Sequence, residues 1–320
     1  MPWAEVIGRA ANAVLSLFLM GLVGYILARR NWFTDESKAL VPRLVTVIAL
    51  PPYLFVNILT TFNRGELAGL IYGVAVPALS IIGAALISMG LIRLLKVRPG
   101  RRGLFMVGIT CSNTMFIGLP VNITLFGMDA LPYVLLYFFA NTVFFWTLGN
   151  YSLSLDGPGK AAPLLSLQTV KRVLSPPLCG FFLGLLLVTA EMRPPEFFMS
   201  AAAYIGSLTT PLAIIFIGAT LATVSLKELK PDRDIIVVML GRFVLSPLLV
   251  IGLTRIFTLP PLMAKVFIIQ SSLPMVASAG LMAGYYKSDV AFASVSVSLS
   301  TILSMATIPL YMIIISLLNF

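Results

Sequence analysis

Long apolar stretches separated by short charged connectors dominate the chain. A membrane-spanning helix needs about 20 mostly apolar residues, and the 320-residue sequence holds ten stretches of that kind. They cover residues 10–28, 44–62, 67–95, 103–125, 131–153, 173–190, 201–226, 235–257, 262–285 and 290–318. The apolar runs are continuous and do not alternate every second residue, so they predict helices rather than the strands of a β-barrel. We therefore expect an all-α integral membrane protein with ten transmembrane helices.

Composition narrows the class of protein further. Hydrophobic residues make up 59% of the chain and charged residues only 11%, and there is no histidine. A soluble domain carries about a quarter of its residues as charges, which excludes a soluble enzyme with a solvated surface. The lack of histidine excludes histidine-based catalysis and histidine metal clusters. We therefore expect no enzyme, no metal site and no cofactor.

The basic residues predict an orientation in the membrane. Sixteen of the 22 Lys and Arg follow odd-numbered stretches, five lie on the other side, and Arg242 falls inside the eighth stretch. Because basic connectors stay in the cytoplasm, both termini are expected outside it. The basic excess is thus a sign of orientation, and nucleic-acid binding is not expected.

The acidic residues bear on the driving force. All 12 Asp and Glu fall in connectors or termini. A proton antiporter of the NhaA type uses buried carboxylates, so we expect no carboxylate-based proton coupling in the core. Three alternatives stay open: coupling to Na⁺ held by carbonyl and Asn, Ser or Thr oxygens, uniport driven by the membrane potential, and entry of a protonated substrate.

The two halves of the chain resemble each other at a nearly constant offset of 159 residues. Pro52 falls on Pro211, for example, and Asn141 falls on Ser300. We predict five-helix repeats over residues 1–155 and 169–320, joined by a cytoplasmic linker over 156–168. Because each half has an odd number of spans, the halves must be inverted, which is typical of secondary transporters.

The fourth and ninth stretches each contain helix breakers. Residues 111–120 read C-S-N-T-M-F-I-G-L-P and residues 270–280 read Q-S-S-L-P-M-V-A-S-A-G, with Asn113 placed on Ser272 by the offset. Pro120 suits the first turn of a new helix. In lipid, a broken helix is tolerated only where it packs on protein or lines a cavity. Two broken helices crossing near the midplane would present unpaired N–H groups and positive dipole ends, which suit a carboxylate.

Asn113 is the first candidate for substrate binding, because its amide can donate to a carboxylate, although it can also cap the broken backbone. Thr and Ser are weaker candidates, since in membrane helices they usually bond to their own backbone. Asn141 is polar at mid-depth and is expected to support the crossing with a hydrogen bond. The expected substrate-binding residues are Asn113, Thr114, Gly118, Pro120, Asn141, Ser271, Ser272 and Pro274.

A further set of residues has two interpretations of about equal weight. Arg242 either snorkels toward the cytoplasm or attracts an anionic substrate with its charge. Pro51, Pro52 and Pro211 either kink their helices to shape a cavity wall or only adjust helix packing.

The run S-N-T-M-F-I-G-L-P, the later break at Pro274 and the ending S-T-I-L-S-M-A-T-I-P-L resemble the auxin efflux carrier family. That family includes plant PIN-type carriers and bacterial malate or malonate permease-like proteins. The resemblance covers essentially the whole chain, without the long cytoplasmic loop of many plant members.

The resemblance implies the fold of NhaA and the bile-acid transporters, with helices 4 and 9 crossing. It implies a scaffold of helices 1, 2, 6 and 7, a transport unit of helices 3–5 and 8–10, a homodimer and an elevator motion in a bacterial inner membrane. The implied function is secondary-active or facilitative transport of small organic anions. A Na⁺ symporter of the bile-acid-transporter type and a membrane sensor or channel domain are the alternatives.

Overall fold

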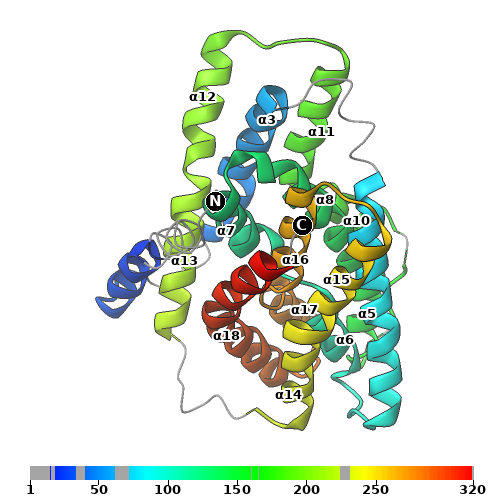
Figure 1. Cartoon of the computed structure of the whole chain (residues 1–320). Coiled ribbons are helices and arrows are strands. Elements are labelled where there is room, and N and C mark those ends of the chain that lie inside the picture. The colour runs from blue at the N-terminus through cyan, green and yellow to red at the C-terminus, as the bar shows by residue number, and fades with distance from the viewer. Residues whose placement is uncertain are drawn as a thin grey trace. The chain divides into compact units, whose positions relative to one another are not determined.

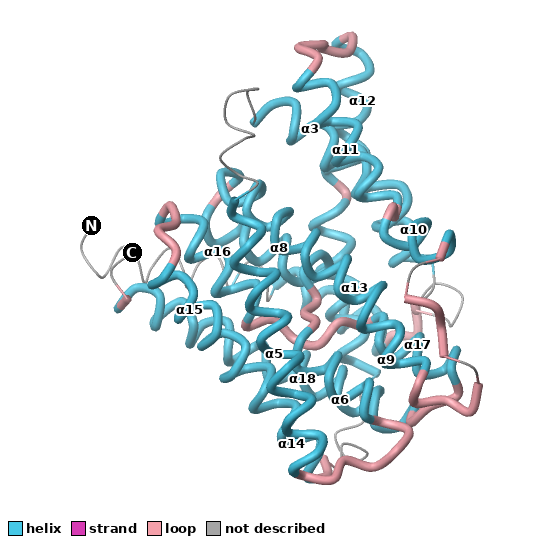
Figure 2. The backbone as a smooth tube through the Cα atoms, turned by 90° about the vertical axis from the view of Figure 1, so that its right-hand side faces the viewer, coloured by secondary structure: helices cyan, strands magenta, loops and turns pink. Residues whose placement is uncertain are grey.

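The computed structural model of the chain describes residues 15, 19–33, 40–61, 72–159, 161–164, 166–223 and 231–318. In these ranges the regular elements are helices (Figures 1 and 2). Six of the described helices are long and apolar enough to cross a membrane. They are Leu40–Thr61, Tyr72–Leu94, Met128–Ser154, Glu196–Ala222, Arg233–Ile256 and Val290–Leu317. The prediction of an all-α membrane protein is confirmed.

Four further apolar helices among the described residues are shorter than a full span: Leu19–Arg29, Thr114–Phe126, Pro176–Thr189 and Pro261–Ser271. Each overlaps a stretch that the sequence predicts to be transmembrane. Parts of the predicted stretches 10–28, 44–62, 67–95 and 201–226 lie outside the described residues. The total of ten spans and their inverted arrangement therefore stay predictions.

The chain divides into two compact units, and each draws on both halves of the sequence. Unit 1 contains Met1–Tyr72, Leu119–Pro132 and Lys171–Val224. Unit 2 contains Gly73–Gly118, Tyr133–Val170 and Ser225–Phe320.

Unit 1 is held together by close helix packing. Helix α3 (Leu50–Thr61) packs along α11 (Pro176–Thr189) and α12 (Glu196–Ser207), as both views show (Figures 1 and 2). A Cβ atom on Gly180 of α11 would collide with the backbone of Pro51. Small residues at such contacts let membrane helices approach closely.

Unit 2 surrounds α6 (Arg102–Thr110). Helix α5 (Ala75–Leu94) packs against α6 and α15 (Ser246–Ile256), and α14 (Arg233–Leu240) packs against α6 and α18 (Val290–Leu317). The remaining helices of this unit are α8 (Leu131–Phe144), α9 (Asn150–Ser154), α10 (Leu167–Val173), α16 (Pro261–Ser271) and α17 (Ser278–Tyr286); the last residues of α10 belong to unit 1.

Carboxylates cap the helices at one end of unit 2. Asp232 accepts a hydrogen bond from the Ile235 N–H at 3.0 Å at the start of α14, and Asp289 accepts one from the Phe292 N–H at 2.9 Å at the start of α18. Asp156 accepts from the N–H groups of Gly103 and Leu104 near the start of α6. These caps satisfy donors that the first turn of a helix leaves open.

Wide π-helical turns lie just before prolines in three places. They are η1 (Leu44–Ala49) before Pro51, η3 (Thr114–Gly118) before Pro120, and η6 (Gly241–Leu245) before Pro247. Proline has no N–H and its ring crowds the carbonyl four residues earlier, so the preceding turn widens instead of closing the usual bond.

The three expected kink positions differ from one another. Pro51 and Pro52 lie inside the continuous α3, with the change of helix type just before them. Pro211 lies in α13 (Thr209–Thr223), and α12 ends four residues earlier, at Ser207. Ser207 carries the carbonyl that the missing N–H of Pro211 would have bonded, which explains why the helix is interrupted there.

Candidate functional site

The chain leaves the helix at two places in unit 2, as the sequence predicts for its fourth and ninth stretches. Helix α6 ends at Thr110, and the helix resumes at Thr114 with η3. Helix α16 ends at Ser271, and α17 begins at Ser278. We call residues 111–113 the first break and residues 272–277 the second break.

The two breaks pair with each other as a short antiparallel bridge between Ser112 and Met275. The Asn113 N–H donates to the Pro274 carbonyl at 2.9 Å, and the Val276 N–H donates to the Cys111 carbonyl at 3.0 Å. The two interrupted helices therefore meet backbone to backbone, so each break supplies partners for the other.

Side chains hold both sides of this bridge. The Asn141 amide accepts from the Ser112 N–H at 3.0 Å and donates to the Ser112 carbonyl at 3.1 Å. The Ser300 hydroxyl accepts from the Met275 N–H at 3.1 Å. Asn141 thus makes the hydrogen bond to the crossing that the sequence predicts. Ser300 was not predicted as a site residue, although the 159-residue offset had already paired it with Asn141.

These bonds correct one expectation about the crossing. The sequence predicted unpaired N–H groups there, but the N–H groups of Ser112, Asn113, Met275 and Val276 all have partners. A buried backbone donor without a partner costs free energy, and the pairing of the two breaks removes that cost. These four N–H groups are therefore not open to a ligand.

Asn113 is the predicted residue whose side chain stays available. It is half-buried, and within the described ranges its amide group makes no hydrogen bond. The hydroxyls of Ser271 and Ser272 bond to carbonyls of their own helix, to Ile268 at 2.7 Å and Ile269 at 2.9 Å. The expectation that serines here bond to their own backbone is thus confirmed.

Gly118 allows η3 to lie against α16. A Cβ at this position would collide with Oε1 of Gln270 and with the side chain of Leu273. Thr114 is buried, and its carbonyl lies 3.5 Å from Nε2 of Gln270. Pro120 is the second residue of α7 (Leu119–Phe126), in its first turn as predicted, and belongs to unit 1.

Arg242 is fully buried, with 0% of its surface exposed. Its Nη2 donates to the carbonyl of Ser271, the last residue of α16. Its Nε and Nη1 have no hydrogen-bond partner among the described residues. The snorkelling interpretation is therefore wrong, because the guanidinium turns toward the second break and not toward the surface.

Two polar residues near the breaks were not predicted as site residues. Gln270 is fully buried just before the second break, with no partner for Oε1 in the described part of the chain. The Ser246 hydroxyl donates to the Ile109 carbonyl, one residue before the end of α6, at 2.8 Å. Both are polar residues within apolar stretches, and this pattern could have marked them as candidates.

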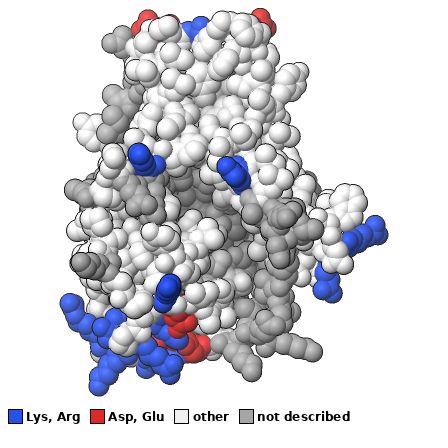
Figure 3. Space-filling model, turned by 180° about the vertical axis from the view of Figure 1, so that it is seen from behind, with Lys and Arg blue, Asp and Glu red and all other residues white. Residues whose placement is uncertain are grey.

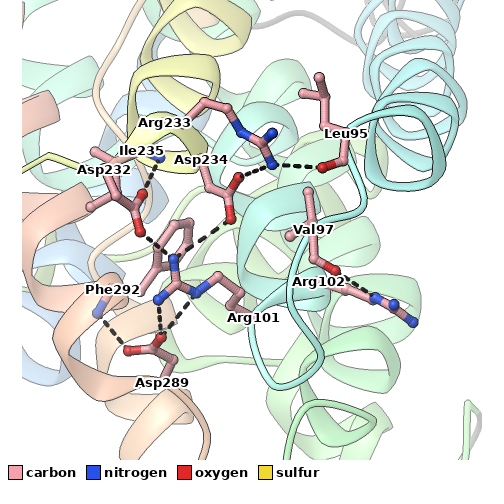
Figure 4. A network of polar contacts seen from close by, with 10 residues as sticks. All are labelled: Leu95, Val97, Arg101, Arg102, Asp232, Arg233, Asp234, Ile235, Asp289 and Phe292. Carbon is pink, nitrogen blue, oxygen red and sulfur yellow. Dashed lines mark hydrogen bonds and ion pairs between the residues drawn. The ribbon is translucent and has the colours of Figure 1, made fainter.

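A separate cluster of charged side chains lies in unit 2, where several of its helices begin (Figure 4). Arg101 forms ion pairs with Asp232, with Asp289 at 2.6 Å and with Asp234 at 3.6 Å. Burial alone would raise the pKa of Asp232, but the Ile235 N–H and Arg101 outweigh it and lower that pKa. The cluster joins the starts of α6, α14 and α18.

Basic side chains gather beside acidic ones at the lower end of the surface in Figure 3. The Asp residues that pair with Arg101 cap helices, and Arg233 pairs with Asp234 at 3.2 Å. None of the ion pairs found among the described residues involves Arg242.

Comparison with known proteins finds transporters that resemble this chain over nearly its whole length. The profile of a family described as "Membrane transport protein" matches residues 10–162 and 152–312. An uncharacterized transporter of Methanothermobacter thermautotrophicus is 27% identical over 312 residues, covering 95% of this chain and 98% of its own. An uncharacterized transporter of Methanocaldococcus jannaschii is 22% identical over 304 residues, covering 94% and 97%. The chain therefore belongs to the membrane transport protein family, that of the auxin efflux carriers.

Proposed function

We propose that the protein carries small organic anions across the membrane, as a secondary-active or facilitative transporter, with the substrate carboxylate held at the paired breaks. The observation that most supports this proposal is the bridge between the two interrupted helices. It leaves the Asn113 amide beside it available for a ligand. The Asn113 amide would donate to the carboxylate. Gly118 and Pro274 shape the backbone around it.

Charge supports an anion over a cation at this place. Arg242 is buried beside the second break. The described acidic residues of unit 2 sit at helix ends and connectors, where Arg101 and backbone N–H groups engage them. A buried positive charge without an acidic partner favours a negatively charged ligand.

Two features support an elevator motion of inverted repeats. Unit 2 gathers the segments around both breaks, while unit 1 holds α3, α11, α12 and α13, so the division separates a candidate moving part from a candidate scaffold. Asn141 and Ser300, equivalent under the 159-residue offset, each support one break. Both are what an inverted-repeat carrier would need.

Uptake into proteoliposomes tests the proposal, with a panel of mono- and dicarboxylates and with Na⁺, pH and membrane potential varied separately. Asn113→Ala should abolish saturable uptake while the protein still elutes as a folded species. The matched control is Asn57→Ala in unit 1, because among the described residues the Asn57 amide bonds within its own helix, to the Tyr53 carbonyl at 2.7 Å. Unchanged uptake in Asn113→Ala would contradict the site. A Na⁺ requirement would favour the symporter alternative.

A further inference from the structure

We infer that Arg242 is the fixed positive charge of the carrier, and that it sets the preferred substrate as an anion of single charge. This inference rests on the proposed function of the paired breaks as the anion site. Arg242 acts as a positioning residue, through its electric field, because it is fully enclosed and anchored on the Ser271 carbonyl.

The first step is that this charge has no counter-ion in the described part of the chain. Arginine keeps its charge when it is buried. The described acid nearest in sequence on the same helical run is Asp234, eight residues earlier, and it pairs with Arg101 and Arg233. Eight residues of helix span about 12 Å. A buried charge in this position needs compensation from something other than a neighbouring carboxylate.

The second step is where the guanidinium lies. It bonds to the C-terminal residue of α16, and Ser246, four residues along, bonds to the carbonyl next to the end of α6. The C-terminal end of each helix carries roughly half a negative charge. In size, the single positive charge of Arg242 equals the negative ends of α6 and α16 together.

The third step concerns the other two helix ends at the breaks. The helical segments that begin at Thr114 and at Ser278 turn their positive ends toward the breaks. Each contributes roughly half a positive charge. With the negative ends offset by Arg242, the balance around the breaks is about one positive charge, and one carboxylate neutralises it.

The consequence is a rule for charge movement. Without substrate, the surroundings of the breaks carry about one positive charge across the membrane, whereas with a bound monocarboxylate they carry none. A fully ionised dicarboxylate would leave a negative charge in the site and should be a poorer substrate than a monocarboxylate of the same size.

The test compares the wild type with Arg242→Gln and Arg242→Lys in proteoliposomes. The matched control is Arg255→Gln, further along the same run of helix, where the side chain is exposed. The readouts are KM and kcat for a monocarboxylate, and the rate of self-exchange with and without an imposed membrane potential. Self-exchange isolates the loaded form, because the empty form need not cross.

We expect Arg242→Gln to raise KM by roughly tenfold or more, because removing a buried unit charge near the site weakens the attraction for an anion. Self-exchange by the wild type and by Arg242→Lys should not respond to the potential, whereas that of Arg242→Gln should. Arg255→Gln should match the wild type.

Three results would overturn the inference: an unchanged KM in Arg242→Gln, voltage-dependent exchange in the wild type, or equal preference for mono- and dicarboxylates. If Arg242→Gln does not fold, the wild type and Arg242→Lys still decide through the voltage response. A failure of the proposed function itself would give a different result, because the wild type would then show no saturable uptake of any carboxylate.

Discussion

Replacing Asn141 by Ala should loosen the bridge between the breaks. The change removes both the acceptor of the Ser112 N–H and the donor to the Ser112 carbonyl, and Ser112 is fully buried. Leaving the buried Ser112 N–H unpaired costs about 1–3 kcal/mol, whereas the Ser112 carbonyl keeps a second donor, the Thr114 N–H at 2.9 Å. The alanine side chain is too short to restore either bond.

Thermal unfolding in detergent measures this effect. At about 2 °C per kcal/mol for a large chain, the midpoint should fall by about 2–6 °C. Asn57→Ala is the matched control, since in the described part of the chain the Asn57 amide bonds to its own helix, and its midpoint should stay near that of the wild type. If Asn141→Ala and Asn57→Ala melt together, the side chain does not hold the break and the reasoning fails.

Two further changes probe the packing and the charged cluster. Gly118→Ala should lower stability by about 1–3 kcal/mol, because its Cβ meets Gln270, whereas Gly280→Ala, which has open space around its Cβ, should be nearly neutral; equal unfolding midpoints would refute the close contact. The lowered pKa of Asp232 means that its pairing with Arg101 stabilises the fold above the unfolded value near 4 and is lost as pH falls through the folded value. The midpoint of the wild type should therefore drop on acidification, and Arg101→Gln should lack that part of the drop when the two are melted across a pH series.

The apolar pattern was sufficient to predict helices, and the helix breakers were sufficient to predict the two interruptions. Continuous apolar runs leave few alternatives to helix in lipid, and the breakers around Asn113 and Pro274 mark where the helix cannot continue. The offset of 159 residues even paired Asn141 with Ser300, which the structure shows supporting opposite sides of one bridge.

Other parts of the site could not be predicted. Two breaks of a few residues each carry no alternating pattern, so nothing in the sequence said that they would pair and consume each other's N–H groups. The direction of Arg242 was equally hidden, because a long side chain on a helix can reach toward the surface or toward a neighbouring helix. Only the packing of α14 and η6 against α6 decides it.

The same bridge has a consequence for how the protein is made. Its two sides, Ser112 and Met275, are 163 residues apart in the chain. At a synthesis rate of about 5–20 residues per second, the first break waits roughly 8–30 s for the second. Asn141 follows Ser112 by only 29 residues and bonds both of its backbone groups. The side chain that later supports the site can thus shelter the open backbone of Ser112 in the membrane until the second half of the chain arrives.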